Sequence, residues 1–320
     1  MFERRRILQL ALAGLLPTGA RAQAWPTKPI RVIVPFPPGG TTDYVTRLVT
    51  AQLAKALDQA VVVDNKPGAG TVIGVDAAAK AAPDGHTLVT VANSFTVNQT
   101  LVKNLPYDSA RDLRPVALMG LSEHVLAAHR GLGVRSVAEL IAYAKTNRGM
   151  LSYASFGNGT SAHLAGEMLR AQLGLDIVHV PYKGQGPALS DLLGAQVSLM
   201  FGNWPEFREH IESGKLVAVG MATARRSVFA PSIRTLTEQG AAIESNSWNG
   251  LLAPARTPDA VVARLNAEVN KALASEGVVE AFRKGGIVSM AGSPEQFGAF
   301  LKSETARYAG VIRAAGITAD

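Results

Sequence analysis

The sequence contains no cysteine, which excludes disulfide bridges, thiol nucleophiles, Cys-x-x-Cys redox pairs and thiolate zinc sites. Its six histidines never occur at the close paired spacing typical of a metal site, so no metal is predicted, and no motif indicates a cofactor. Aromatic residues make up only 6% of the 320 residues and charged residues 18%, whereas 47% are hydrophobic. This is the composition of an ordinary globular protein, and the length allows two lobes of about 150 residues each.

Long apolar runs are absent apart from one near the N-terminus. There, three arginines at positions 4–6 precede an apolar run over residues 7–16, and a small-residue site ends at Ala24. The run is too short to cross a hydrocarbon core, which needs about 20 residues. Residues 1–24 are therefore predicted to be an export signal cleaved after Ala24, with a loose similarity to a twin-arginine signal.

The positive charge of the chain is concentrated in this segment. Without its net charge of +3, the formal net charge falls from +7 to +4. The remaining lysines and arginines are scattered, and no basic run is interleaved with aromatic residues, so no nucleic-acid partner is predicted. A mildly positive surface still attracts small anions.

Short β-branched runs alternate with helical patterns along the rest of the chain. Buried strands are predicted over residues 30–34, 60–63, 87–91, 151–154, 177–180, 197–200 and 216–219. Apolar residues that share one face predict helices over residues 42–57 and 161–172, and further helical patterns follow Pro258 and Pro294. This alternation is typical of an α/β fold with mostly parallel sheets flanked by helices.

Glycine-rich loops connect several of these strands to the helices that follow. They occupy residues 37–43, 64–71, 156–161 and 181–186. Because each loop ends at a helix N-terminus near the carboxyl edge of a sheet, its unpaired N–H groups can bind an anion. Thr or Asp is expected to cap the helix over residues 42–57, and Pro187 to open the helix after the last loop. Glycine also serves tight turns, but one loop design repeated in both halves of the chain favours anion binding.

Three further features could indicate an enzyme, but each is less convincing than the anion-binding loops. The segment over residues 68–74 is similar to a dinucleotide-binding motif, but its spacing is one residue too long and Pro67 lies in the turn. Ser161 and His163 could share a helix face, as in a hydrolase, but no nearby acid would orient the imidazole, so His163 is better explained as a hydrogen-bonding residue at a helix start. Asp43 is better explained as a carboxylate that ties down its loop than as a base. A secreted hydrolase and a protein-interaction module remain the alternatives.

Five segments carry a resemblance in order and spacing: 25–43 (WPTKPIRVIVPFPPGGTTD), 65–70 (NKPGAG), 83–88 (PDGHTL), 105–108 (LPYD) and 179–184 (HVPYKG). Together they resemble the substrate-binding receptors of tripartite tricarboxylate transporters, of the Bug type. The resemblance implies a non-enzymatic, two-lobed periplasmic receptor of Venus-flytrap architecture, which closes on a small carboxylate and delivers it to a membrane permease. The expected ligand is a di- or tricarboxylate, an acidic amino acid or an aromatic acid, and the receptor is expected to be a monomer.

Sequence order and the resemblance together predict where the lobes and the ligand lie. One lobe is expected to take residues 25–123 and 248–320 and the other residues 124–247, with crossings near residues 124–126 and 249–251. In such receptors two loops of opposite lobes grip the carboxylate, and segments 93–95 and 201–204 are expected to shape its distal end. The site residues that the resemblance implies are Phe36, Gly39, Gly40, Thr41, Thr42, Asp43, Ser94, Ser155, Gly157, Asn158, Gly159, Thr160, His163, Tyr182, Lys183 and Asn203.

Two segments depart from the family pattern. Residues 122–124 (Ser-Glu-His) stand where a proline is often found before the crossing strand, and residues 131–133 (Gly-Leu-Gly) replace a proline-bearing turn. The sequence therefore does not predict the hinge in detail. Trp204 fits either a pocket wall or ordinary core.

Overall fold

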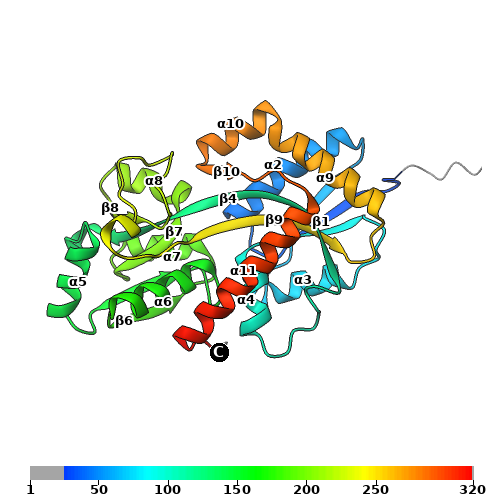
Figure 1. The fold of residues 1–320 in the computed structure, drawn as a ribbon. Helices are drawn as coiled ribbons and strands as arrows, with labels where there is room; N and C mark the ends of the chain where they lie inside the picture. The colour runs from blue at the N-terminus through cyan, green and yellow to red at the C-terminus, as the bar shows by residue number, and fades with distance from the viewer. Residues whose placement is uncertain (1–24, 319–320) are drawn as a thin grey trace, which may run out of the picture.

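Helices pack around one continuous sheet of ten strands in the computed structural model, which describes residues 25–318 (Figure 1). The predicted export segment, residues 1–24, lies outside the described residues. Across residues 25–318, no helix is both long and apolar enough to span a lipid bilayer. The strand order along the sheet is β2-β1-β3-β9-β4-β7-β5-β6, and β8 and β10 also pair with β4.

The first half of the sheet is built by the N-terminal and C-terminal parts of the chain. Its elements are β1 (Ile30–Val34), α2 (Thr41–Ala56), β2 (Val61–Asn65), η1 (Ala69–Thr71), α3 (Val72–Ala79), β3 (Thr87–Val91), α4 (Asn93–Leu101), β9 (Asn246–Pro254), α9 (Asp259–Ala274), α10 (Glu276–Lys284), β10 (Ile287–Ser289) and α11 (Pro294–Ala315). Strand β1 pairs in parallel with β2 and β3, whereas β9 is antiparallel to β3. Val45, Val49 and Leu53 recur every fourth residue of α2 and are buried in the core, so the apolar face predicted from the sequence is the face that packs on the sheet.

The second half of the sheet is built by the middle of the chain, drawn mainly in green in Figure 1. Its elements are η2 (Arg130–Leu132), α5 (Val137–Thr146), β5 (Leu151–Ser155), α6 (Ser161–Leu173), β6 (Ile177–Pro181), α7 (Gln185–Leu193), β7 (Leu199–Asn203), α8 (Trp204–Glu212), β8 (Leu216–Met221) and η3 (Thr237–Gln239). Strand β5 pairs in parallel with β6 and β7. The two halves therefore contain the same arrangement of parallel strands, each followed by a helix.

One long strand, β4 (Leu113–His129), joins the two halves (Figure 1). Its residues up to Glu123 pair with β9, and its residues from His124 onward pair with β7 and β8. The sequence predicts a crossing here but not a strand of 17 residues, because the polar Ser122 and His124 interrupt the apolar pattern. Gly250 and Leu251, expected at the second crossing, pair with β3 and β4 inside the first half of the sheet.

The division into lobe 1 (residues 25–123 and 248–320) and lobe 2 (residues 124–247) stays a prediction, and these names are kept for the two parts. The hydrophobic clusters support it, because two large clusters contain only lobe 1 residues and two others contain only lobe 2 residues. A smaller cluster connects α4, α6 and α11 across the lobes. It consists of Val97, Leu101, Leu164, Tyr308 and Ile312.

The α/β class and the two groups of parallel strands are confirmed, with three local corrections. Strand β7 spans residues 199–203 rather than 197–200, because it pairs with β4 as far as His124. Helix α7 begins at Gln185 rather than at Pro187, because Gly184, with a φ of 113°, ends the loop as the N-cap residue. Helix α2 is capped neither by Thr nor by Asp, since its N-cap residue is Gly40.

Candidate functional site

A chain of polar side chains crosses the junction between the lobes, from the N-terminus of α2 to the N-terminus of α6. Asn203 Nδ2 donates a hydrogen bond to Thr41 Oγ1 at 3.0 Å, and Asn203 pairs with His124 across strands β7 and β4. His124 Nε2 lies 3.0 Å from Ser247 Oγ, which in turn lies 3.2 Å from Ser161 Oγ. These five residues are called the junction network below. They link the two helix starts through the strands that cross between the lobes.

His124 is the fully buried centre of this network. Its Nδ1 lies 3.0 Å from Ser245 Oγ, and its ring meets Phe156 edge to face with 5.9 Å between centroids. Burial lowers the pKa of His124 to about 3, so the imidazole is neutral at physiological pH. A neutral imidazole offers one N–H donor and one acceptor nitrogen, which the hydroxyls of Ser245 and Ser247 can both satisfy. His124 therefore ties the crossing strands together without adding charge.

His124 should make the folded protein lose stability in acid. The unfolded chain binds a proton on this side chain near its ordinary pKa of about 6.5, whereas the folded chain binds one only near about 3. Its contribution is therefore present above about pH 6.5 and is lost as the pH falls through this window, by up to about 1.4 kcal/mol per pH unit. Urea unfolding of His124→Gln should show a shallower loss of stability than the wild type between about pH 6.5 and pH 4.

The matched control for this experiment is His210→Gln, because His210 lies on α8 and is only partly buried. This variant should follow the wild-type pH profile. Parallel profiles for the wild type and His124→Gln would contradict the assignment of a neutral, buried imidazole.

The Pro-Gly-Gly loop before α2 is held by Asp43. Gly39 has a φ of 89°, in the left-handed region that favours glycine, and its N–H donates to Asp43 Oδ2 at 3.0 Å. Arg47 Nε donates to the same oxygen at 2.9 Å. Burial alone would raise the pKa of Asp43, but the hydrogen bonds from Arg47, Gly39 and Asn65 lower it below its usual value. Asp43 ties down the loop, as the sequence predicts for it in preference to a role as a base.

Helix α2 presents its first turn at the junction. Its N-cap residue, Gly40, has no side chain to cap the helix, so the first N–H groups, including those of Thr41 and Thr42, are open to an external acceptor. The helix dipole adds positive potential at the same place. The Phe36 carbonyl at the base of the loop accepts a hydrogen bond from Asn65 Nδ2 at 3.1 Å. Of these predicted site residues, Thr41 reaches lobe 2 directly through Asn203.

The Gly-Asn-Gly loop before α6 packs against the opposite lobe. Gly157 donates from its N–H to the buried Ser155 Oγ at 3.2 Å, and its carbonyl accepts a hydrogen bond from the Thr160 hydroxyl at 2.8 Å. Thr160 is the N-cap residue of α6 but makes no side-chain cap, so this helix start is also open. Gly159 has a φ of 72°, and a Cβ atom there would lie 2.8 Å from Leu101 Cδ2 of lobe 1. Only glycine fits this close approach between the lobes without rearrangement.

His163 is a hydrogen-bonding residue at the start of α6, as the sequence predicts. Its Nδ1 accepts the Gly159 N–H at 3.1 Å, and its ring stacks on His179 with 3.9 Å between centroids. The Ser161 hydroxyl instead contacts Ser247. The geometry therefore gives no support to a Ser161–His163 hydrolase pair.

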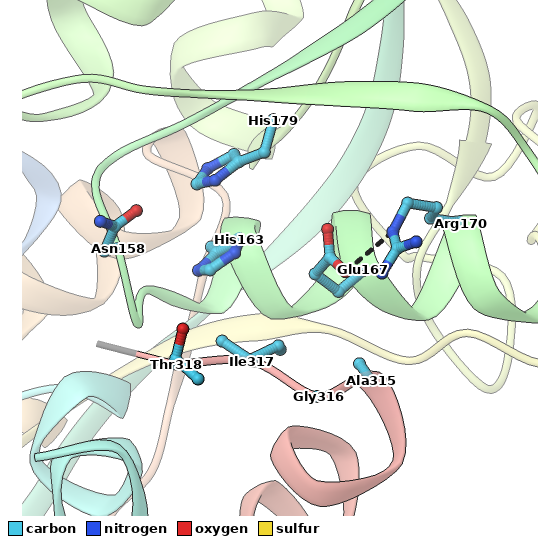
Figure 2. Close-up of a pocket in the computed structure, with 9 residues that line it drawn as sticks. All are labelled: Asn158, His163, Glu167, Arg170, His179, Ala315, Gly316, Ile317 and Thr318. Carbon is cyan, nitrogen blue, oxygen red and sulfur yellow. Dashed lines mark hydrogen bonds and ion pairs between the residues drawn. The ribbon is translucent and has the colours of Figure 1, made fainter. Parts of the chain in front are cut away.

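A polar cavity of about 210 Å³ lies beside α6 and the end of α11 (Figure 2). The predicted site residues Asn158 and His163 border it, together with His179. Glu167 lies at its wall, where it accepts hydrogen bonds from Arg170 at 2.6 Å and from the Tyr153 hydroxyl at 2.7 Å. Residues 315–318 close the opposite side.

The remaining predicted site residues lie outside the junction network. Ser94 Oγ lies 3.1 Å from Thr71 Oγ1 within lobe 1. The Tyr182 hydroxyl donates to Asp191 Oδ2 at 2.6 Å, and the side chain of Lys183 is exposed. The structure therefore brings Thr41 and Asn203 together but does not bring Ser94, Tyr182 or Lys183 to them.

The sequence places His124 at a crossing between the lobes but does not identify it, Ser247 or Glu206 as site residues. Thr41 Oγ1 donates a hydrogen bond to Glu206, which lies in the first turn of α8. One signal for His124 is in the sequence: it is a polar residue that directly precedes the apolar residues 125–128. Glu206 and Ser247 give no comparable signal, because their roles depend on contacts between segments far apart in the chain.

Several buried polar atoms near the junction have no hydrogen-bond partner among the described residues. They are Ser122 Oγ, Gln185 Nε2, Asn203 Oδ1, Glu206 Oε2, Asn246 Oδ1 and both amide atoms of Asn249. Buried polar groups in native proteins are almost always hydrogen-bonded, so a small polar ligand and water suit this region. Within residues 25–318, no group of three histidine, cysteine or acidic side chains could hold a metal ion.

Comparison with known proteins decides the family. The chain matches the model for the tripartite tricarboxylate transporter family receptor, TctC, over residues 45–317. It is also 39% identical over 310 residues to Protein BugT of Bordetella pertussis (strain Tohama I), an alignment that covers 96% of this chain and 95% of BugT. The chain belongs to the TctC receptor family. The resemblance read from the sequence motifs is thereby confirmed.

Solved structures agree with this assignment to the TctC receptors. A structure described as a periplasmic transporter is 38% identical, with a TM-score of 0.86 over 93% of this chain and all of that chain. R. palustris Rpa4515 with adipate is 33% identical, with a TM-score of 0.87 over 92% of this chain and 99% of that chain. The chain is therefore a TctC-family periplasmic solute receptor with the α/β periplasmic binding protein fold, and it is not an enzyme.

Proposed function

We propose that this receptor binds a small organic carboxylate between lobes 1 and 2 and delivers it to the membrane permease of a tripartite tricarboxylate transporter. The observation that carries the proposal is the junction network, which has an open helix N-terminus at each end, at Thr41 of α2 and Ser161 of α6. The relative Rpa4515, whose structure contains adipate, supports a carboxylate as the ligand class.

No lysine or arginine is among the five residues of the junction network. A carboxylate bound here is therefore held by hydrogen bonds and helix dipoles and not by a cationic side chain. Micromolar affinity needs about 8 kcal/mol. Charge-assisted hydrogen bonds from backbone N–H groups contribute roughly 1.5–3 kcal/mol each, and a helix terminus adds up to about 2 kcal/mol. Apolar closure around the ligand has to supply the rest, because association also costs translational and rotational freedom.

Closure of the lobes would link binding to transport. A ligand that contacts both helix starts binds the closed arrangement more tightly than an open one, and this differential affinity shifts the population toward the closed form. The permease could then distinguish loaded from empty receptor. Under this proposal the ligand is a di- or tricarboxylate, an acidic amino acid or an aromatic acid, the receptor acts as a monomer, and residues 1–24 are removed after Ala24 during export.

A thermal-shift screen of ligand-free protein tests the ligand class. Succinate, citrate, glutamate and benzoate would each be added at about 1 mM, with glucose and calcium chloride as non-carboxylate controls. At least one carboxylate should raise the midpoint of unfolding by a few degrees, because a ligand at 100 times its Kd stabilises the native state by about 2.7 kcal/mol. A clear shift with the sugar or the cation, and none with any carboxylate, would contradict the proposal.

A further inference from the structure

Glu206 places an acidic group at the junction of a receptor for anions. It lies in the first turn of α8 in lobe 2, and Thr41 Oγ1 of lobe 1 donates a hydrogen bond to its Oε1. The same Thr41 hydroxyl accepts a hydrogen bond from Asn203 Nδ2 at 3.0 Å. Because Asn203 already supplies a donor to Thr41, the Thr41 proton is directed to Glu206, which acts as the acceptor.

The second carboxylate oxygen of Glu206 has an unmet need for a donor. Oε2 is buried and has no hydrogen-bond partner among the described residues. Burial raises the pKa of Glu206, whereas the donor groups of Thr41, of its own backbone, of Asn203 and of Gln185 lower it, and the effect of burial is the larger. A buried acceptor of this kind is stabilised by a group that donates a hydrogen bond and is destabilised by a second negative charge.

The side chains beside the Glu206 carboxylate do not supply a positive charge that would offset a second negative charge. The amides of Asn203 and Gln185 lie near its carboxylate and lower its pKa, but neither side chain carries a positive charge. Trp204, the preceding aromatic residue of α8, is buried against Gly286 of lobe 1. A ligand carboxylate at the start of α2 already lies near Glu206, which bonds Thr41, so a second carboxylate turned toward Glu206 would add another like charge in a partly desolvated space.

We infer that Glu206 determines the ligand class within the proposed carboxylate site, by selecting acids whose distal group is a hydrogen-bond donor. Such ligands carry a carboxamide, a hydroxyl or an ammonium group opposite the bound carboxylate, in place of a second ionised carboxylate. This inference rests on the proposed function, since it assumes that one carboxylate occupies the junction between the lobes.

Matched pairs of ligands that differ only at the distal end test this inference. Isothermal titration calorimetry at about pH 8, where both carboxylates of each diacid are ionised, would compare succinate with its monoamide, adipate with its monoamide, and terephthalate with 4-carbamoylbenzoate. The wild type should bind the monoamide of at least one pair about 10-fold more tightly than the diacid. In Glu206→Gln, which keeps the shape of the side chain but removes its charge, this preference should disappear or reverse.

Glu209→Gln is the matched control, because Glu209 lies on the same helix and is exposed. It removes the same charge and should keep the wild-type preference. A preference for the diacid in the wild type, or a monoamide preference that survives in Glu206→Gln, would overturn the role of Glu206 while leaving the carboxylate receptor intact. Failure of all six acids to bind, together with the absence of any carboxylate shift in the thermal screen, would overturn both proposals. If Glu206→Gln did not fold, the wild-type ratio alone would decide the ligand class.

Discussion

Replacing Gly159 by valine should lower carboxylate affinity by about 100-fold while leaving a folded protein. Gly159 is the point where the α6 loop of lobe 2 meets α4 of lobe 1, and an added Cβ would lie 2.8 Å from Leu101 Cδ2 and 3.4 Å from Val97 Cγ1. A branched side chain would keep the lobes apart, so the ligand could contact one helix start but not both. Calorimetric titration with the best carboxylate of the thermal-shift screen would measure the loss.

Backbone strain alone has to be separated from this steric effect. Gly159 has a φ of 72°, where any other residue costs roughly 1–2 kcal/mol of stability. Gly149 in lobe 2 has the same φ of 72°, but its nearest neighbour, Asp176 Oδ2, would lie 3.9 Å from an added Cβ. Gly149→Val should therefore lose similar stability and keep its affinity. Equal affinity losses in the two variants would argue against a closed interface at Gly159.

Replacing Asn203 by leucine should also lower carboxylate affinity, by roughly 30- to 100-fold. Leucine removes the hydrogen bond from Asn203 Nδ2 to Thr41 Oγ1, which couples the two lobes, and puts an apolar side chain beside the buried His124. Breaking a buried hydrogen bond in this way costs about 1–3 kcal/mol, and this cost falls on the closed, ligand-bound form in which the lobes meet. Titration calorimetry measures the affinity, and thermal unfolding without ligand measures the cost to the fold.

Asn147→Leu provides the comparison for Asn203→Leu. Asn147 is a partly buried asparagine of the same lobe whose amide donates to Tyr143 O, within its own helix end, at 3.0 Å. Its replacement should cost stability without changing carboxylate affinity. If Asn203→Leu likewise lowered the stability but left the carboxylate affinity unchanged, the junction network would not contribute to binding.

The parts of the fold that depend on local pattern could be predicted from the sequence. The apolar run over residues 30–34 and the one-sided face of α2 match the structure closely, because burial of a strand or a helix face demands a regular spacing of apolar residues. The role of Asp43 was also predictable, since a carboxylate near a helix start has nearby N–H groups to bind. The long strand β4 was harder, because polar residues interrupt it at the crossing.

The candidate site was only partly predictable for a different physical reason. Thr41 and Gly159 lie in glycine loops that motifs can reveal, but Thr41 meets Asn203 across 162 positions of sequence and Ser161 meets Ser247 across 86. Such pairs have no local signal, because they arise only when the sheet brings distant strands together. Glu206 is the extreme case, since an acidic residue at a helix start is usually explained by the helix dipole alone.

The central claim is that helix starts from opposite lobes hold one carboxylate between them. A crystal structure with the tightest-binding carboxylate of the screen tests it most directly. Carboxylate oxygens are expected within about 3 Å of first-turn N–H groups of both α2 and α6, next to Thr41 and Ser161. A carboxylate bound to one lobe only, or bound in the cavity beside His163 and Arg170, would contradict it.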